Sequence, residues 1–351
     1  MREITFKDAI NEAMHEEMSR DETVYTLGET VSQDIWGTSD GLYERFGKQR
    51  VRDTAISEAA IIGSSVGAAL TGYRPVANMM FADFMVCAAD ELLNKAAKWR
   101  FMHGGKVSIP LVVRAQSGGY SRIGPEHSQC MESFVMRVPG LKIAMPSTPY
   151  DAKGLLKTAI RDNNPVVYLE HKNLLGMKGS VPQEEYTIPF GVADIKRDGN
   201  DATVVATGYM VHLVLQVVDL LQKEKGINVE VIDPRTLEPL DIDTIVVSVK
   251  KTKHLVIVDE DTLRCGVGAE IGMQVLENAF DYLDAPIRRV AAKNFPIAGG
   301  YLEQFVLPQP QDMADAICDV LGSEDRLDLK DRVKPKGGFR QDIAQKKNES
   351  R

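Results

Sequence analysis

The chain has 351 residues and a formal net charge of −8, with 44% hydrophobic and 26% charged residues. This composition is typical of a globular protein, and the length suits two domains better than one core. The acidic balance argues against a nucleic-acid-binding surface, and no apolar run is long enough to span a membrane. Four widely spaced cysteines indicate neither a zinc site nor a disulfide framework, and they favour a cytoplasmic protein.

Strand-like and helical patterns alternate along the first half of the chain. In chain order we expect helices at 5–20, 42–46, 56–70, 82–102 and 149–160, and strands at 24–27, 75–80, 109–114, 141–144 and 165–170. The strand at 109–114 is almost wholly apolar, which is typical of a sheet covered on both faces. The alternation therefore predicts a parallel sheet with helices on both sides.

A polar segment at 178–191 with two prolines separates this half from a second one. The alternation then restarts, with strands at 202–207, 228–233, 254–259 and 287–291 and helices at 210–223, 243–250 and 268–277. We therefore predict an α/β protein of two doubly wound domains, at 1–185 and 192–321. The charged residues 322–351 are expected to form a poorly ordered tail.

A single carboxylate lies at the start of the apolar helix predicted at 56–70. Glu58 is the only charged residue of that run, and Arg52 is the nearest cation in the sequence. Glu58 is either an exposed first-turn glutamate favoured by the helix dipole, or a carboxylate in an apolar cleft that shares a proton with a ligand. Gly63 and Gly67, one turn apart, would let a second helix pack closely.

The loop at 114–131 follows the apolar strand at 109–114. Open α/β sheets bind ligands at the carboxyl ends of their strands, and this loop carries several glycines together with Glu126 and His127. A histidine beside a glutamate can titrate near neutral pH, so we expect Glu126 to hydrogen-bond and tune the imidazole. The alternative is a surface loop whose histidine caps the next helix.

Several motifs together resemble one family. They are Arg52-Asp53-Thr54, Ile56-Ser57-Glu58, Gly67-Ala68-Ala69, Gly72-Tyr73-Arg74-Pro75, Met80-Phe81-Ala82-Asp83-Phe84, Ala96-Ala97-Lys98, His127-Ser128-Gln129, Pro139-Gly140-Leu141-Lys142, Pro146-Ser147-Thr148-Pro149 and the run Asp151–Gly154. Over residues 5–321 the sequence resembles the beta subunits of the thiamine-diphosphate-dependent first component of 2-oxo acid dehydrogenase complexes. That group includes pyruvate, branched-chain and acetoin dehydrogenases. The resemblance implies a transketolase-like pyrimidine-binding domain followed by a transketolase C-terminal-like domain.

The resemblance also implies roles for three residues. In this family the glutamate that matches Glu58 hydrogen-bonds the aminopyrimidine ring of thiamine diphosphate, and the residue that matches Phe84 packs on that ring. His127 would serve the transfer of the acyl unit to a lipoyl group. Here Glu126 stands where the family usually has a glutamine, which leaves the substrate class open.

The family requires a second chain. Its alpha subunit holds the diphosphate and Mg²⁺ through a Gly-Asp-Gly motif with a downstream Asn. The nearest match here, Asp198-Gly199-Asn200, lacks the first glycine. We therefore expect half of a cofactor site in this chain, an alpha₂beta₂ heterotetramer, and a lipoyl-bearing acyltransferase component as a further partner.

A structural potassium site is also implied by the resemblance. Its ligands would be largely backbone carbonyls, at Leu111, Ala159, Ile160, Asp162 and Asn164. Oxygen ligands suit such a hard cation. The alternative is an ordinary helix C-terminus in this loop.

The sequence thus predicts an enzyme subunit, the beta chain of a thiamine-diphosphate-dependent oxidoreductase that acts on a 2-oxo acid or acetoin. Two alternatives are the C-terminal half of a split transketolase and a non-catalytic scaffold. The runs at 53–58 and 127–129 favour the dehydrogenase subunits over the transketolase. The position of Glu58 at the start of an apolar helix argues against a scaffold.

Overall fold

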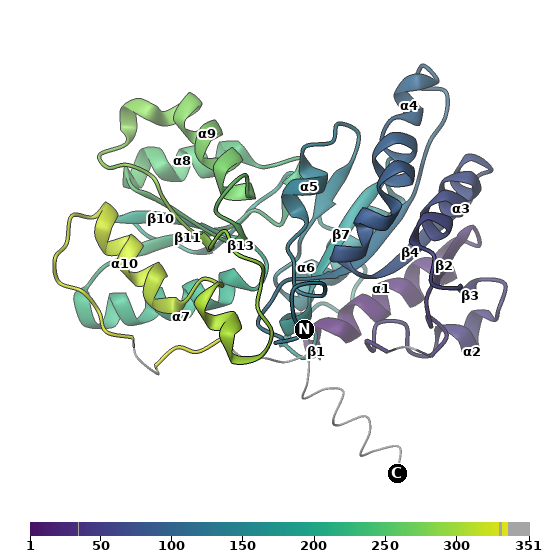
Figure 1. The fold of residues 1–351 in the computed structure, drawn as a ribbon, viewed down its shortest axis with the longest axis horizontal. Helices are drawn as coiled ribbons and strands as arrows, with labels where there is room; N and C mark the ends of the chain where they lie inside the picture. Colours follow the sequence, from purple (N-terminus) through teal and green to yellow (C-terminus); the bar gives the residue numbers. More distant parts are fainter. Residues whose placement is uncertain (34, 330–331, 336–351) are drawn as a thin grey trace, which may run out of the picture.

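The computed structural model describes residues 1–33, 35–329 and 332–335 (Figure 1). Within them, the strands form sheets of seven, five and two strands. The seven-stranded sheet has the order β12-β6-β7-β5-β4-β2-β3, and the five-stranded sheet has the order β14-β13-β10-β11-β9. Apolar side chains from helices pack on both faces of each large sheet, so the predicted α/β architecture of two doubly wound domains is confirmed.

The first sheet is built almost entirely from the first half of the chain. Its strands are β2 (Val24–Gly28), β3 (Val51–Asp53), β4 (Arg74–Phe81), β5 (Val112–Ser117), β6 (Lys142–Ala144) and β7 (Val166–His171), all paired in parallel. The helices around it are α1 (Phe6–Arg20), α2 (Leu42–Phe46), α3 (Glu58–Leu70), α5 (Glu132–Met136) and α6 (Pro149–Arg161). Successive strand side chains face opposite sides, so Val112 packs in the cluster with α1 and α6, and Val113 packs in the cluster with α3.

The helix predicted at 82–102 is present, but its winding changes along its length. This stretch forms the 3-10 helix η1 (Ala82–Ala88), the π-helix η2 (Asp90–Ala96) and the short helix α4 (Trp99–Met102). The linking residues Ala89 and Ala97 also have right-handed helical backbone angles. The ring of Phe84 in η1 lies 5.6 Å from that of Phe81 at the end of β4, a contact that the hydrophobic period of the helix does not reveal.

The second domain repeats the same plan. Its strands are β9 (Asp194–Arg197), β10 (Ala202–Ala206), β11 (Val229–Asp233), β13 (Leu255–Thr262) and β14 (Arg288–Ala292), and its helices are α7 (Met210–Lys225), α8 (Ile242–Thr252), α9 (Val267–Ala279) and α10 (Pro310–Val320), with the 3-10 helices η4 (Phe280–Tyr282) and η5 (Gly300–Phe305). Only β9 runs antiparallel to its neighbour in this sheet. Helix α10 was not predicted, although Pro310 in its first turn and a capping box between Gln309 and Asp312 mark its start.

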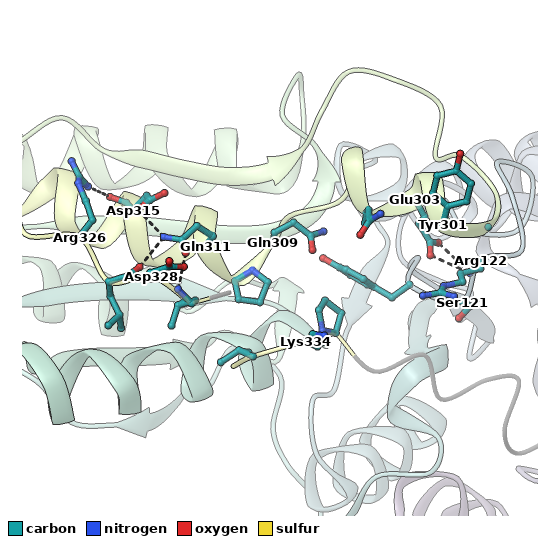
Figure 2. Close-up of a pocket in the computed structure, with 18 residues that line it drawn as sticks. Ser121, Arg122, Tyr301, Glu303, Gln309, Gln311, Asp315, Arg326, Asp328 and Lys334 are labelled. Carbon is teal, nitrogen blue, oxygen red and sulfur yellow. Dashed lines mark hydrogen bonds between the residues drawn. The ribbon is translucent and has the colours of Figure 1, made fainter. Parts of the chain in front are cut away.

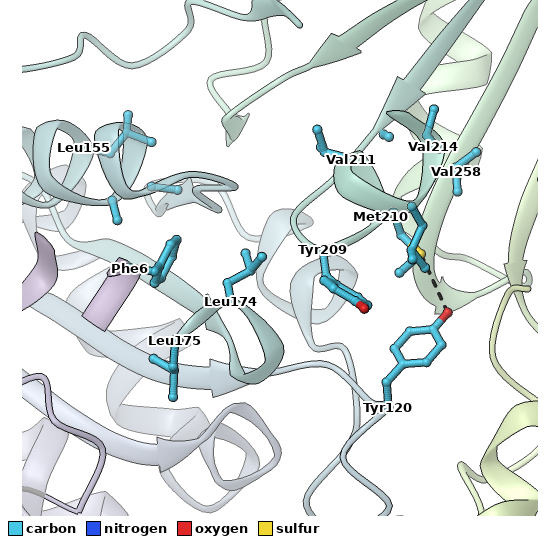
Figure 3. Close-up of a cluster of buried hydrophobic side chains, with 14 of the residues drawn as sticks. Phe6, Tyr120, Leu155, Leu174, Leu175, Tyr209, Met210, Val211, Val214 and Val258 are labelled. Carbon is cyan, nitrogen blue, oxygen red and sulfur yellow. Dashed lines mark hydrogen bonds between the residues drawn. The ribbon is translucent and has the colours of Figure 1, made fainter. Parts of the chain in front are cut away.

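The two halves of the chain are joined by strand pairs and by a shared core. Strand β12 (Thr236–Glu238), from the second half, extends the first sheet by pairing antiparallel with β6. Strand β8 (Lys178–Val181), inside the predicted boundary segment, pairs with β1 (Arg2–Thr5). Figure 3 shows part of the shared core, where the Tyr120 hydroxyl lies 3.8 Å from the sulfur of Met210. The domains are therefore in direct apolar contact.

Part of the segment after Gly322 packs on the C-terminal domain. The structure describes residues 322–329 and 332–335 of it, and the side chains of Leu327, Leu329 and Val333 are buried in the apolar cluster. This stretch is therefore a part of the domain surface and not of a separate tail. Residues 330–331 and 336–351, which we also expected to be poorly ordered, lie outside the described residues.

In the described part of the chain, no helix is long and apolar enough to cross a membrane. All four cysteines are unpaired. Cys130 and Cys318 are buried, whereas Cys87 and Cys265 are exposed.

Helix α3 presents part of its small-residue face to the surface. A Cβ added at Gly63 would lie 3.3 Å from the side chain of Glu91 on η2, so this end of the face is covered within the chain. A Cβ added at Gly67 would meet nothing within 4 Å, and the residue is exposed. The Gly67 end is therefore open to a second molecule.

We expect Gly67→Leu to weaken self-association of the chain without harming its fold. Inside the folded chain the new side chain meets open space, and leucine has a higher helix propensity than glycine. Between two packed helices it would cost on the order of 1–3 kcal/mol of overpacking. Sedimentation of the purified chain measures this, with Lys223→Leu on exposed α7 as the control. A chain that sediments as a monomer both before and after the change would contradict the prediction.

Candidate functional site

The candidate site lies at the carboxyl ends of the parallel strands of the first sheet. Phe81 ends β4, the loop that carries His127 follows β5, and Lys172 follows β7. Glu58 begins the helix that follows β3 of the same sheet. The carboxyl ends of parallel strands share one edge, which is where open α/β sheets bind ligands. The structure therefore brings both segments singled out from the sequence to one edge.

Phe84 and His127 belong to one aromatic cluster. Their ring centroids are 5.4 Å apart, and both rings contact Phe81, at 5.6 and 4.6 Å respectively. Trp36 also packs against Phe81, at 5.3 Å. All four contacts are edge-to-face, the arrangement that aromatic quadrupoles favour. Phe84 and His127 are only half-buried, so part of each ring is available to a ligand.

The loop around His127 is held by hydrogen bonds to its main chain. The buried side chain of Lys172 donates from Nζ to the carbonyl oxygen of His127 at 2.9 Å. The buried carboxylate of Asp83 accepts from the main-chain N–H of Gln129 at 3.2 Å and from its side-chain amide at 3.0 Å. These bonds set the backbone position from which the imidazole projects.

The expected contact between Glu126 and the imidazole is absent from the described part of the chain. Glu126 is exposed, and the ring of His127 packs against Phe81 and Phe84. The capping alternative is also wrong, because α5 begins after Met131 with no side-chain cap. The position of the His127 imidazole is therefore set by the aromatic cluster and by the hydrogen bonds of Lys172 and Asp83 to the loop.

Glu58 has a carboxylate without a hydrogen-bond or ion-pair partner among the residues that the structure describes. The one nearby cation seen in the sequence is engaged elsewhere, since Arg52 lies over the ring of Tyr25 at 4.9 Å and donates to the carbonyl oxygen of Gln49. Burial, followed by the negative charge of Glu58, raises the pKa of Glu29. The carboxylate of Glu58 is therefore free to bind a donor from a ligand.

Several residues of the site were missed in the sequence. Asp83 lies inside the motif at 80–84, but its role was not predicted because its partner Gln129 is 46 positions away in the sequence. Glu29 and Lys172 each follow a strand of the first sheet, and the rule that strand ends bind ligands would have selected both.

The residues of the predicted potassium site lie at the opposite edge of the sheet, before β5 and β7. The carbonyl oxygens of Ile160 and Asp162 converge, because both accept from Nη1 of Arg74, at 3.0 and 2.9 Å. The carbonyl of Leu111 accepts from a main-chain N–H, as does that of Ala159. Asn164 donates from its N–H to the Asp162 carboxylate at 2.8 Å. Among the described residues, no group of three or more His, Cys, Asp or Glu could hold a metal ion.

A cavity of about 1090 Å³ lies beside the beginning of the His127 loop (Figure 2). It is lined by Tyr120 and Arg122 of the loop, by Glu303, and by the segment after α10. Burial raises the pKa of Glu303 to about 7, and its carboxylate accepts from the N–H of Arg122 at 3.1 Å. His127 is not among the residues that line the cavity, whereas Tyr120 and Arg122 of the same loop are.

Comparison with known proteins identifies both domains and close relatives. The family model "Transketolase, pyrimidine binding domain" matches residues 2–178, and "Transketolase, C-terminal domain" matches residues 191–313. An acetoin:2,6-dichlorophenolindophenol oxidoreductase subunit beta from Bacillus subtilis (strain 168) is 44% identical, covering 92% of this chain and 98% of the relative. The 2-oxoisovalerate dehydrogenase subunit beta from the same organism is 45% identical, covering 91% and 99%. A pyruvate dehydrogenase E1 component subunit beta from Rickettsia felis is 44% identical, covering 91% and 98%.

The chain belongs to the family of 2-oxo acid and acetoin dehydrogenase beta subunits. This confirms the resemblance seen in the sequence and the predicted order of the two domains.

The fold of this beta-subunit family is shared more widely. A solved structure described as "Split gene transketolase, inactive beta4 tetramer" matches with a TM-score of 0.74, over 92% of this chain and 99% of that chain. Only 21% of its residues are identical, so the likeness shows the fold alone.

Proposed function

We propose that this chain is the beta subunit of a thiamine-diphosphate-dependent oxidoreductase. Together with an alpha subunit, it would cleave the bond next to a carbonyl in a 2-oxo acid or acetoin and pass the acyl unit to a lipoyl acceptor. The observation that carries the proposal is the contact between Phe84 and His127, at the sheet edge where Glu58 has a free carboxylate. The relatives named for acetoin, 2-oxoisovalerate and pyruvate support this range of substrates.

Glu58 and Phe84 fit the aminopyrimidine ring of thiamine diphosphate. The half-buried ring of Phe84 can pack against a flat heterocycle. The carboxylate of Glu58, which has no hydrogen-bond or ion-pair partner among the described residues, could bind a nitrogen of that ring. The cofactor, when bound, supplies the electron sink for cleavage of the bond next to the carbonyl.

His127 would act in the transfer to the lipoyl group. In that step the hydroxyl-bearing carbon would form a bond to one lipoyl sulfur while the S–S bond breaks and the other sulfur takes a proton. The carbon's hydroxyl would then lose its proton as the bond to the departing carrier group breaks, which leaves a thioester. The carbon is oxidised and the disulfide is reduced. An imidazole that is half-buried and packed against Phe84 could deliver that proton to the sulfur.

The remaining parts of the site would come from a partner chain. This sequence lacks the Gly-Asp-Gly motif, so we propose that the diphosphate and Mg²⁺ bind to the alpha subunit of an alpha₂beta₂ heterotetramer. A lipoyl-bearing acyltransferase component would be the second partner. The four unpaired cysteines support a location in the cytoplasm.

The potassium site is a further part of the proposal. The convergent carbonyls of Ile160 and Asp162 support it. Each carbonyl oxygen that accepts a hydrogen bond from Arg74 has a second lone pair that could bind a cation. A bound ion stabilises only the folded chain. We therefore expect a higher melting temperature in KCl than in NaCl at equal ionic strength. Equal melting temperatures in the two salts would contradict the site.

Glu58→Gln tests the assignment of the cofactor site. The amide has the same shape and can still hydrogen-bond, but it cannot exchange the proton, so we expect exchange of the thiazolium proton to slow by roughly 10²–10⁴-fold. The measurement uses the complex reconstituted with its alpha subunit. Glu277→Gln, which changes an exposed carboxylate on α9 of the C-terminal domain, is the control and should exchange normally. Normal exchange in Glu58→Gln would overturn the assignment.

His127→Ala tests the transfer role. We expect it to spare thiamine diphosphate binding and proton exchange, and to slow reduction of a lipoyl domain by roughly 10²–10⁴-fold, because one acid–base group is lost. The rate with the dye 2,6-dichlorophenolindophenol, which needs no lipoyl sulfur, should fall much less. Equal losses with both acceptors would mean that His127 acts on binding or on the cofactor itself.

A further inference from the structure

Lys172 is a buried ammonium next to the site, and it differs from the other buried lysines of the chain. Its side chain is 1% exposed, as are those of Lys153 and Lys157 on α6. Lys153 and Lys157 both form ion pairs with Glu16, at 2.6 and 2.7 Å. Among the described residues no carboxylate lies within 4 Å of Lys172 Nζ. A buried charge without an ion pair is costly, so its other contacts must compensate.

Those contacts all belong to the site. Nζ of Lys172 donates to the carbonyl oxygen of His127 at 2.9 Å and lies over the ring of Phe81, 5.6 Å from its centroid. The ring of Phe81 in turn contacts His127 and Phe84. The Lys172 ammonium therefore contacts both the backbone of His127 and the ring of Phe81, against which the His127 imidazole packs.

The main chain that carries Lys172 is anchored by contacts of the preceding residue. Its neighbour His171 is paired with Ser117 of β5 in the sheet and lies with Nε2 2.8 Å from the carboxylate of Glu260 in the C-terminal domain. The His171 ring also stacks on Tyr209 at 5.0 Å. Lys172 therefore projects from a fixed base, which allows its tip to set the position of the loop.

We infer that Lys172 is a positioning residue for His127. Its ammonium lies over the ring of Phe81 and holds the His127 carbonyl by a hydrogen bond, and this fixes the direction in which the imidazole projects. Asp83 holds the next part of the loop through Gln129, so the histidine lies between two buried side chains of opposite charge. This inference rests on the proposed function of His127, and it adds a residue that does not itself touch the reacting atoms.

Lys172→Met removes the charge and the donor while keeping a long apolar side chain. In the complex with the alpha subunit, before cofactor is added, we expect faster hydrogen–deuterium exchange in peptides that cover residues 118–131. Lys157→Met is the matched control, because it removes an equally buried ammonium far from the site. It should leave exchange in that loop unchanged. Unchanged loop exchange in Lys172→Met would overturn the inference.

The functional effect should be specific to His127. In the loaded complex we expect Lys172→Met to lower kcat for lipoyl reduction by roughly 10–100-fold with little change in KM, because a misplacement of about 1 Å can cost that much. In the His127→Ala background the same substitution should cost nothing more, since it acts only through the imidazole. Where Lys172→Met does not assemble, Lys172→Gln, which removes the charge and shortens the side chain, takes its place in both backgrounds.

The outcomes separate this inference from the proposed function. If His127→Ala alone leaves lipoyl reduction intact, the proposed role of His127 is wrong. If His127→Ala is impaired as expected but the Lys172 substitution is neutral, or lowers the rate equally in both backgrounds, the positioning role is wrong. Full non-additivity supports it.

Discussion

The buried carboxylate of Glu260 is the contact on which the geometry of the site depends. It comes from β13 of the C-terminal domain, accepts from the N–H of Gly119 where the site loop begins, and lies 2.8 Å from Nε2 of His171. A hydrogen bond to such a buried carboxylate typically contributes about 1.5–3 kcal/mol. The close approach also explains Gly118, where φ is +86° and an added Cβ would lie 2.1 Å from His171 Nε2. The C-terminal domain thus holds the site loop in place, although the four rings described for the aromatic cluster all come from the first domain.

The remainder of the site follows from the first sheet. Parallel strands with alternating apolar side chains are covered on both faces, so polar groups accumulate where the strands end. The 3-10 winding after β4 adds Phe84 to Phe81, and the loop after β5 adds His127. Asp83 and Lys172 hold that loop by its main chain. Aromatic contacts and buried charges therefore act together on one histidine.

Much of this could be predicted from the sequence, and the failures have physical causes. Strands and long helices follow from local periodicity, and Glu58, Phe84 and His127 follow from motifs that are contiguous in the chain. The residues that hold the site loop in place could not be predicted from such motifs. Lys172 and Glu260 bind His127 and Gly119, which lie 45 and 141 residues away in the sequence. The changes of winding at 82–102 were missed because no glycine or proline accompanies them. Adjacency in sequence also misled, because it suggested a contact between Glu126 and His127 that the folded loop does not make.

The central claim is that this chain supplies the pyrimidine half of a thiamine diphosphate site. An experimental structure of the chain in complex with its alpha subunit and thiamine diphosphate tests it most directly. We expect a Glu58 carboxyl oxygen within about 3 Å of a ring nitrogen of the aminopyrimidine, with the ring of Phe84 packed on that heterocycle. We also expect the imidazole of His127 to face the cofactor. A cofactor bound with its pyrimidine away from Glu58 and Phe84 would contradict the claim.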